Sequence, residues 1–165
     1  MVRIGITGHM DLTASSVGLV RAALLETLAP HVPDGLTGVS CIAAGADSIF
    51  AEVVLEVGGG LEVILPAADY RERKVKADHA EMFDRLVRRA ESVRVMPYAV
   101  SDRAAYEAAN EALLESVNLL VAVWDGRAPA DRGGTASVVE QARSKGLEVR
   151  IVWPDGAERS SDRRT

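Results

Sequence analysis

The stretch that decides the fold is Arg3-Ile4-Gly5-Ile6-Thr7-Gly8-His9, which runs from a short apolar segment into a glycine turn. A second stretch, Leu119-Leu120-Val121-Ala122-Val123-Trp124-Asp125-Gly126, has the same form and is followed by Gly133-Gly134-Thr135. A strand that ends in glycines and opens a helix is typical of an anion site, because free amides and the helix dipole face the negative charge. Two such turns at one sheet edge favour a phosphorylated, nucleotide-like ligand.

Apolar runs and helical patterns alternate along the whole chain. Alternating strands and helices predict an α/β fold, a three-layer Rossmann-like arrangement in which helices flank a mostly parallel sheet. In such sheets ligands bind beyond the carboxyl ends of the strands, where the strand order reverses, and we expect that point between the first and fifth strands. The expected strands cover residues 2–7, 38–43, 61–65, 93–96, 118–124 and 148–153.

Length and composition are those of one ordinary globular domain. The chain has 165 residues, of which 48% are hydrophobic and 26% are charged, and no internal repeat or second composition regime divides it. We therefore expect a single domain over residues 1–154. Residues 155–165 have little apolar surface to bury, so we expect a flexible C-terminal tail there.

Charge and residue usage exclude several classes of function. The net charge of -5 argues against nucleic acid and acidic membranes as general partners, and no apolar run is long enough to cross a bilayer. Cys41 is the only cysteine, which fits the reducing cytoplasm, and we expect it to be buried in a strand. The three histidines have no partner at metal-ligand spacing, so we expect neither a metal nor a cofactor.

The loops after the first, second, third and fifth strands hold the candidate site residues. His9 either hydrogen-bonds a ligand or caps its own turn, and Asp47 either caps the second helix or accepts hydrogen bonds from ribose hydroxyls. Tyr70 and Arg71 either pack at the surface or contact a base and a phosphate. The candidate ligand-binding residues are Thr7, Gly8, His9, Gly45, Ala46, Asp47, Tyr70, Arg71, Asp125, Gly126, Arg132, Gly133, Gly134 and Thr135.

The order of these motifs resembles the SLOG superfamily, which joins the Rossmann domain of DNA-processing protein A with the Lonely Guy proteins. Ala43-Ala44-Gly45-Ala46-Asp47 is similar to the glycine turn after the second strand in that superfamily, and Gly133-Gly134-Thr135 to its phosphate-binding segment. The resemblance covers residues 2–154. It implies a Rossmann-like fold that binds a nucleotide or a nucleotide-derived ligand. With the apolar helix faces it also suggests a homo-oligomer, such as a homodimer.

The chain departs from the Lonely Guy motif, which is close to P-G-G-x-G-T-x-x-E. Those enzymes cleave a base from a nucleoside 5′-monophosphate. Arg132 stands at the position of the proline, and the next acid, Glu140, lies two positions too far along the helix. A shift of two residues turns a helical side chain by about 200°. The family's activity therefore does not carry over to Glu140.

Two functions stay open, and a third, DNA handling as in the DNA-processing proteins, is disfavoured by the acidic charge and the absence of a basic stripe. The first is a sensor or carrier that binds the nucleotide-like small molecule without changing it. The second is a nucleoside 5′-monophosphate N-glycosidase (phosphoribohydrolase) or a related transferase. That chemistry needs a proton donor at the leaving base and a carboxylate near the sugar carbon. The candidate catalytic carboxylates are Asp47, Asp125 and Asp69.

Overall fold

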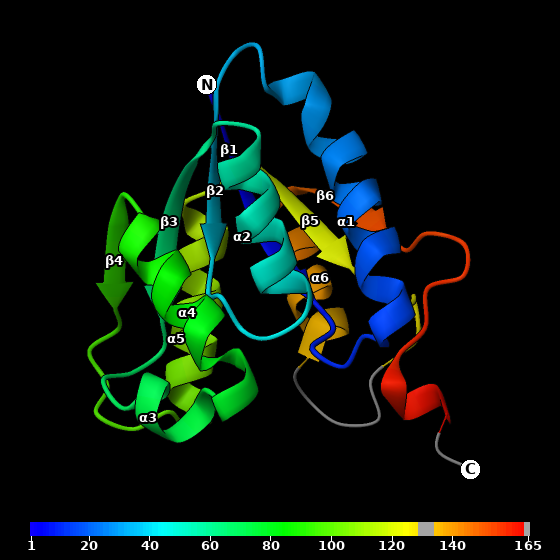
Figure 1. The fold of residues 1–165 in the computed structure, drawn as a ribbon. Coiled ribbons are helices and arrows are strands. Elements are labelled where there is room, and N and C mark those ends of the chain that lie inside the picture. The colour runs from blue at the N-terminus through cyan, green and yellow to red at the C-terminus, as the bar shows by residue number, and fades with distance from the viewer. Residues whose placement is uncertain (129–133, 164–165) are drawn as a thin grey trace.

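The computed structural model describes residues 1–128 and 134–163, and it has the three-layer α/β fold that the sequence predicts (Figure 1). Every strand pair in the six-stranded sheet is parallel, and the strand order is β4-β3-β2-β1-β5-β6. The strands are β1 (Val2–Gly8), β2 (Leu36–Ser40), β3 (Gly60–Leu65), β4 (Ser92–Val95), β5 (Leu119–Val123) and β6 (Glu148–Val152). The α-helices are α1 (Ala14–Leu28), α2 (Ala46–Glu56), α3 (Tyr70–Lys74), α4 (Ala77–Arg89), α5 (Arg103–Glu115) and α6 (Gly134–Ser144), and two 3-10 turns are η1 (Ala29–His31) and η2 (Ser160–Arg163).

Helices cover both faces of the sheet. Helices α1, α2 and α4 lie on one face, and α5 and α6 lie on the other (Figure 1). Along β5, Val121 packs in the cluster that contains α1 and α2, whereas Leu120 packs in the cluster that contains α5 and α6. A strand covered on both faces must be apolar throughout, which explains the continuous apolar run of β5.

The strand order reverses between β1 and β5. From β1 the chain proceeds outward through β2 and β3 to β4, and then returns to place β5 on the other side of β1. Gly8 is in register with Val123, so the two strands end at the same level of the sheet. The position predicted for the switch point is therefore confirmed.

Strand β2 ends at Ser40, earlier than the sequence predicts. The Ser40 hydroxyl accepts a hydrogen bond from the amide of Ile42 (2.9 Å) and donates one to the backbone oxygen of Asp47 (3.1 Å). These bonds turn the chain out of the sheet, and Ile42 takes a positive φ of 45°. Cys41 therefore lies beyond the strand and is half-buried, which corrects the expectation of a buried strand residue.

Two of the predicted glycine turns pack against each other. A β-carbon added at Gly8 would lie 2.5 Å from the β-carbon of Ala46, and one added at Gly45 would lie 2.6 Å from the backbone oxygen of His9. The Ala46 amide donates a hydrogen bond to that same oxygen at 3.1 Å. These glycines let the end of β1 contact the start of α2 directly. In the described residues, no helix combines the length and apolar character needed to cross a membrane.

We expect Gly45→Ala to lower the free energy of unfolding by about 2–3 kcal/mol, because the new methyl group meets the His9 carbonyl in a strained backbone conformation. Gly58→Ala is the matched control, since Gly58 also has a positive φ (+84°) but open space around an added β-carbon. That control should cost about 1–2 kcal/mol. Urea unfolding measures both losses. Equal losses would contradict the close approach of the two loops.

Candidate functional site

The end of β1 and the end of β5 are joined through His9. The His9 amide donates a hydrogen bond to the backbone oxygen of Val123 (3.1 Å), and the Asp125 amide donates one to His9 Nε2 (3.1 Å). Nε2 therefore acts as an acceptor, and the proton of the neutral ring lies on Nδ1. The ring is 7% exposed and meets Trp153 edge-on at a centroid distance of 5.6 Å. His9 thus holds the loop after β5 against the end of β1.

Burial keeps His9 neutral. Desolvation lowers the pKa of its imidazole, and the nearby positive charge of Arg159 acts in the same direction. The carboxylate of Asp125 opposes this but does not reverse it, so the pKa stays below the usual range. A neutral ring is what the acceptor role of Nε2 requires.

Asp125 presents a buried carboxylate at the switch point, with a side chain that is 5% exposed. Oδ1 accepts a hydrogen bond from the Arg127 amide (3.0 Å) and lies 3.4 Å from His9 Nε2. Oδ2 is buried and has no hydrogen-bond partner among residues 1–128 and 134–163, and Nη1 of Arg159 lies 3.7 Å away from it. Burial acts to raise the pKa of this carboxyl, but the hydrogen bond from the Arg127 amide and the positive charge of Arg159 help to hold it below its usual value. Asp125 is therefore ionised at neutral pH, and in the described part of the chain one of its oxygens accepts no hydrogen bond.

The segment after β6 supplies the guanidinium of this cluster. Arg159 Nε donates to Asp11 Oδ1 at 2.9 Å, and the residue forms an antiparallel bridge with Leu12. The Ser160 amide donates to the backbone oxygen of Asp11 (2.6 Å), and Arg127 Nη1 contacts Asp162 Oδ1 at 2.9 Å. The segment from residue 155 to 163, for which the sequence predicts a flexible tail, makes these contacts with the loop after β1. Backbone hydrogen bonds and ion pairs hold the segment there. The number of apolar residues in a segment does not predict interactions of these kinds.

The second loop carries Asp47 in the first turn of α2. The side chain is half-buried, and burial raises the pKa of the carboxyl to about 7, against a smaller opposing effect of the Ala43 amide. The negative charge of Asp47 also adds to the raised pKa values of Cys41 and Tyr70, after burial as the main cause. A carboxyl of this kind exchanges protons near neutral pH.

The third-loop candidates do not join the cluster around Asp125. Tyr70 is 5% exposed and contacts the rings of Phe83 and Tyr106 in the core. Arg71 is exposed and forms a bidentate pair with Asp84 of α4, at 2.9 and 2.8 Å. Burial of Tyr70 against Phe83 explains why an aromatic residue stands at this loop position.

Asp69, the remaining carboxylate candidate, ties two loops together. Its Oδ1 accepts hydrogen bonds from the amide (2.8 Å) and the hydroxyl (2.7 Å) of Ser101. Ser101 is 5% exposed and lies just before α5. These contacts join the loop after β3 to the one after β4.

The loop after β5 is described at its two ends. Gly126 has a φ of +82°, and Trp124 Nε1 donates to the backbone oxygen of Arg127 at 3.0 Å. At the start of α6, Gly134 has a φ of +78° with open space around an added β-carbon, and Thr135 is 7% exposed. The candidates Arg132 and Gly133 lie outside the described residues.

Sequence reasoning missed three residues of the cluster, namely Asp11, Trp153 and Arg159. Asp11 lies in the first loop but carries no pattern that separates it from a solvated acid. Arg159 stands in a polar segment, and its contact with Asp11 spans 148 residues of sequence. No local signal identifies such a pair.

No protein-family model matches the sequence, and no curated protein matches it. Solved structures do match the fold. DNA processing protein A from Helicobacter pylori, described for its single-stranded DNA binding mode, has a TM-score of 0.68 and 14% identity over 98% of this chain and 70% of its own. The same protein from Streptococcus pneumoniae has a TM-score of 0.66 and 15% identity over 92% of this chain. This chain spans half the length of the Streptococcus protein.

A third match is the molybdenum cofactor binding protein from Rippkaea orientalis, with a TM-score of 0.60 and 16% identity over 93% of this chain and 77% of its own. At these identities the likeness concerns the fold. One neighbour is described as binding a cofactor and another as binding single-stranded DNA, so the fold by itself excludes neither kind of ligand. The chain therefore shares the Rossmann-like fold of these proteins, which is the fold that its motifs predicted.

Proposed function

We propose that the chain binds a nucleotide or a nucleotide-derived phosphorylated ligand, as a sensor or carrier. The ligand would lie beyond the carboxyl ends of β1 and β5. The observation that carries this proposal is the buried Oδ2 of Asp125, an ionised oxygen without a hydrogen-bond partner among the described residues. Leaving such an atom without a hydrogen bond is costly, so a hydroxyl or amine of a ligand that donates to it binds more strongly. Sugar hydroxyls and base amino groups are donors of this kind.

One positive group lies near this oxygen and suits the phosphate end of the ligand. Arg159 Nη1 lies 3.7 Å from Asp125 Oδ2, and a guanidinium contacts a phosphate and a carboxylate equally well. Helix α6 begins at Gly134 after the loop that follows β5, and the amides at a helix start favour an anion. In this proposal Asp125 accepts a hydrogen bond from the sugar or the base, and Arg159 and the start of α6 hold the phosphate.

The first test is Asp125→Asn with adenosine, guanosine, cytidine and uridine 5′-monophosphates as probes. The amide keeps the size of the side chain and an acceptor for the Arg127 amide, but it loses the charged oxygen. We expect affinity for the bound nucleotide to fall about tenfold or more. Isothermal titration calorimetry measures the affinity, and thermal unfolding checks that the variant is folded.

Glu107→Gln is the control, because Glu107 is exposed on α5 and pairs only with Arg103 within the described chain. Its affinity should equal that of the unmodified protein. Absence of binding by all four nucleotides would refute the proposal. Binding of a single-stranded DNA oligonucleotide in place of the nucleotides would refute it as well.

One observation favours the enzymatic alternative, the release of a base from a nucleoside 5′-monophosphate. The two loop carboxyls have pKa values that are pushed apart, since that of Asp47 is raised to about 7 and that of Asp125 is lowered. Cleavage of an N-glycosidic bond requires a proton donor and an ionised carboxylate, and these two pKa values fit those two roles. Asp47 would protonate the leaving base, and Asp125 would stabilise the positive charge that develops on the sugar.

This alternative predicts that Asp47→Asn lowers free-base release about 100-fold while nucleotide binding is retained. Release should also fall as the pH rises through 7, because the Asp47 carboxyl then loses the proton that it donates. Chromatographic detection of the free base measures both effects. A chain that binds monophosphates and releases no base from them is a carrier or sensor and not a glycosidase.

A further inference from the structure

Strand β6 leaves one edge of the sheet open, because within the described residues it pairs only with β5. The backbone oxygen of Val152 accepts a hydrogen bond from the Trp124 amide, so Val152 turns its backbone groups toward β5. The backbone N–H and C=O groups of successive residues in a strand point to opposite sides. Those of Glu148 and Arg150 therefore also point toward β5, and those of Val149 and Ile151 point away from the sheet. The outward groups form a row of donors and acceptors available to another strand.

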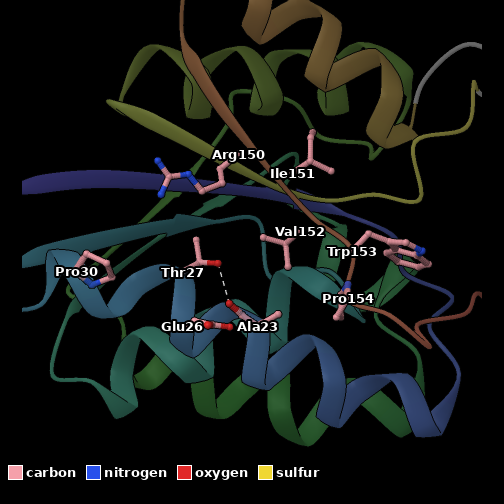
Figure 2. A pocket seen from close by; sticks show the side chains of 9 residues that line it. All are labelled: Ala23, Glu26, Thr27, Pro30, Arg150, Ile151, Val152, Trp153 and Pro154. Carbon is pink, nitrogen blue, oxygen red and sulfur yellow. Dashed lines mark hydrogen bonds between the residues drawn. The ribbon is translucent and has the colours of Figure 1, made fainter.

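The side chains of this edge are accessible too. Glu148 and Arg150 are exposed, and the apolar Ile151 is 39% exposed. No proline, lysine or bulge interrupts Glu148–Val152, although such features protect many natural edge strands. Beside the strand, a hollow of about 360 Å³ lies between β6 and α1, and Arg150 and Ile151 are among the residues that line it (Figure 2).

We propose that the β6 edge binds the β6 edge of a second copy of this chain, antiparallel and around a two-fold axis at Val149. In this register Val149 exchanges both of its backbone hydrogen bonds with Val149 of the other copy. The sheets of the two copies then form one continuous sheet. This interface is independent of the ligand proposed above.

Charge selects this register. With the axis at Val149, Glu148 of each copy lies directly opposite Arg150 of the other, in the non-hydrogen-bonded pairs where side chains approach most closely. An axis at Glu148 would oppose two carboxylates, and an axis at Arg150 would oppose two guanidinium groups. Both are unfavourable.

Within one chain Glu148 and Arg150 already form an ion pair, with 3.0 Å between Arg150 Nη2 and Glu148 Oε1. The two side chains are 64% and 46% exposed, so this pair contributes little to stability. Association exchanges it for two pairs between the copies. The gain comes from the backbone hydrogen bonds and from covering Ile151, and the charges set the register.

The opposite edge of the sheet lacks this pattern. Strand β4 is Ser92-Val93-Arg94-Val95, in which Arg94 is the only charged residue. A second β4 therefore offers Arg94 no carboxylate at any antiparallel register. The β4 edge serves as the internal control.

Sedimentation velocity of the full chain between about 1 and 100 μM tests the proposal. We expect a dimer whose dissociation constant rises about tenfold or more in Glu148→Arg, because both charge pairs become repulsive. The exchanged variant Glu148→Arg/Arg150→Glu should recover the dimer, and Arg94→Glu on β4 should leave it unchanged. Circular dichroism confirms that each variant is folded.

Recovery in the exchanged variant separates pairing between Glu148 and Arg150 from any general effect of charge. A monomer at the highest concentration would overturn the proposal, and so would a dimer that is insensitive to Glu148→Arg. Failure of the exchanged variant to recover the dimer would overturn it too. Hydrogen exchange gives an independent reading, since the amides of Val149 and Ile151 should be protected only in the dimer.

Discussion

The structure depends on the parallel pairing of β1 with β5, two strands far apart in the sequence. Their register places Gly8 beside Val123, so the loops that follow both strands leave the sheet at one level. The His9 ring then joins the loops by accepting a hydrogen bond from the Asp125 amide, and burial keeps the ring neutral for that role. Everything at the candidate site is built on this junction.

Electrostatics at the junction are arranged around a carboxylate. Asp11 and Asp125 both have lowered pKa values although burial acts to raise them, because Arg159 and nearby donors stabilise their ionised forms. Arg159 reaches them from the segment after β6, so the end of the described chain contributes to the same site as its beginning. A ligand that donates a hydrogen bond to Asp125 and carries a phosphate complements both the negative carboxylate and the positive guanidinium of Arg159.

The fold was predictable because its signals are local. All six expected strands overlap observed ones, since each is a short apolar run between breakers. The boundary of β2 was wrong because the Ser40 hydroxyl turns the chain out of the sheet. The glycines were predicted to approach a ligand, and the structure gives them another close contact, between the end of β1 and the start of α2. A glycine pattern predicts that another group approaches the backbone closely, but it does not show whether that group is a ligand or another part of the chain.

The sequence by itself determined the alternation of strands and helices, the place of the switch point and the loops that meet there, because periodicity and breakers act over a few residues. Only the tertiary structure decided which side chains in those loops meet. Tyr70 turned into the core, and Arg71 paired with Asp84. His9 joined Asp125 across 116 residues, and Arg159 joined Asp11 across 148. Such pairs form because the sheet brings together loops that are far apart in the sequence. A pattern that spans a few residues does not show which of these loops will meet.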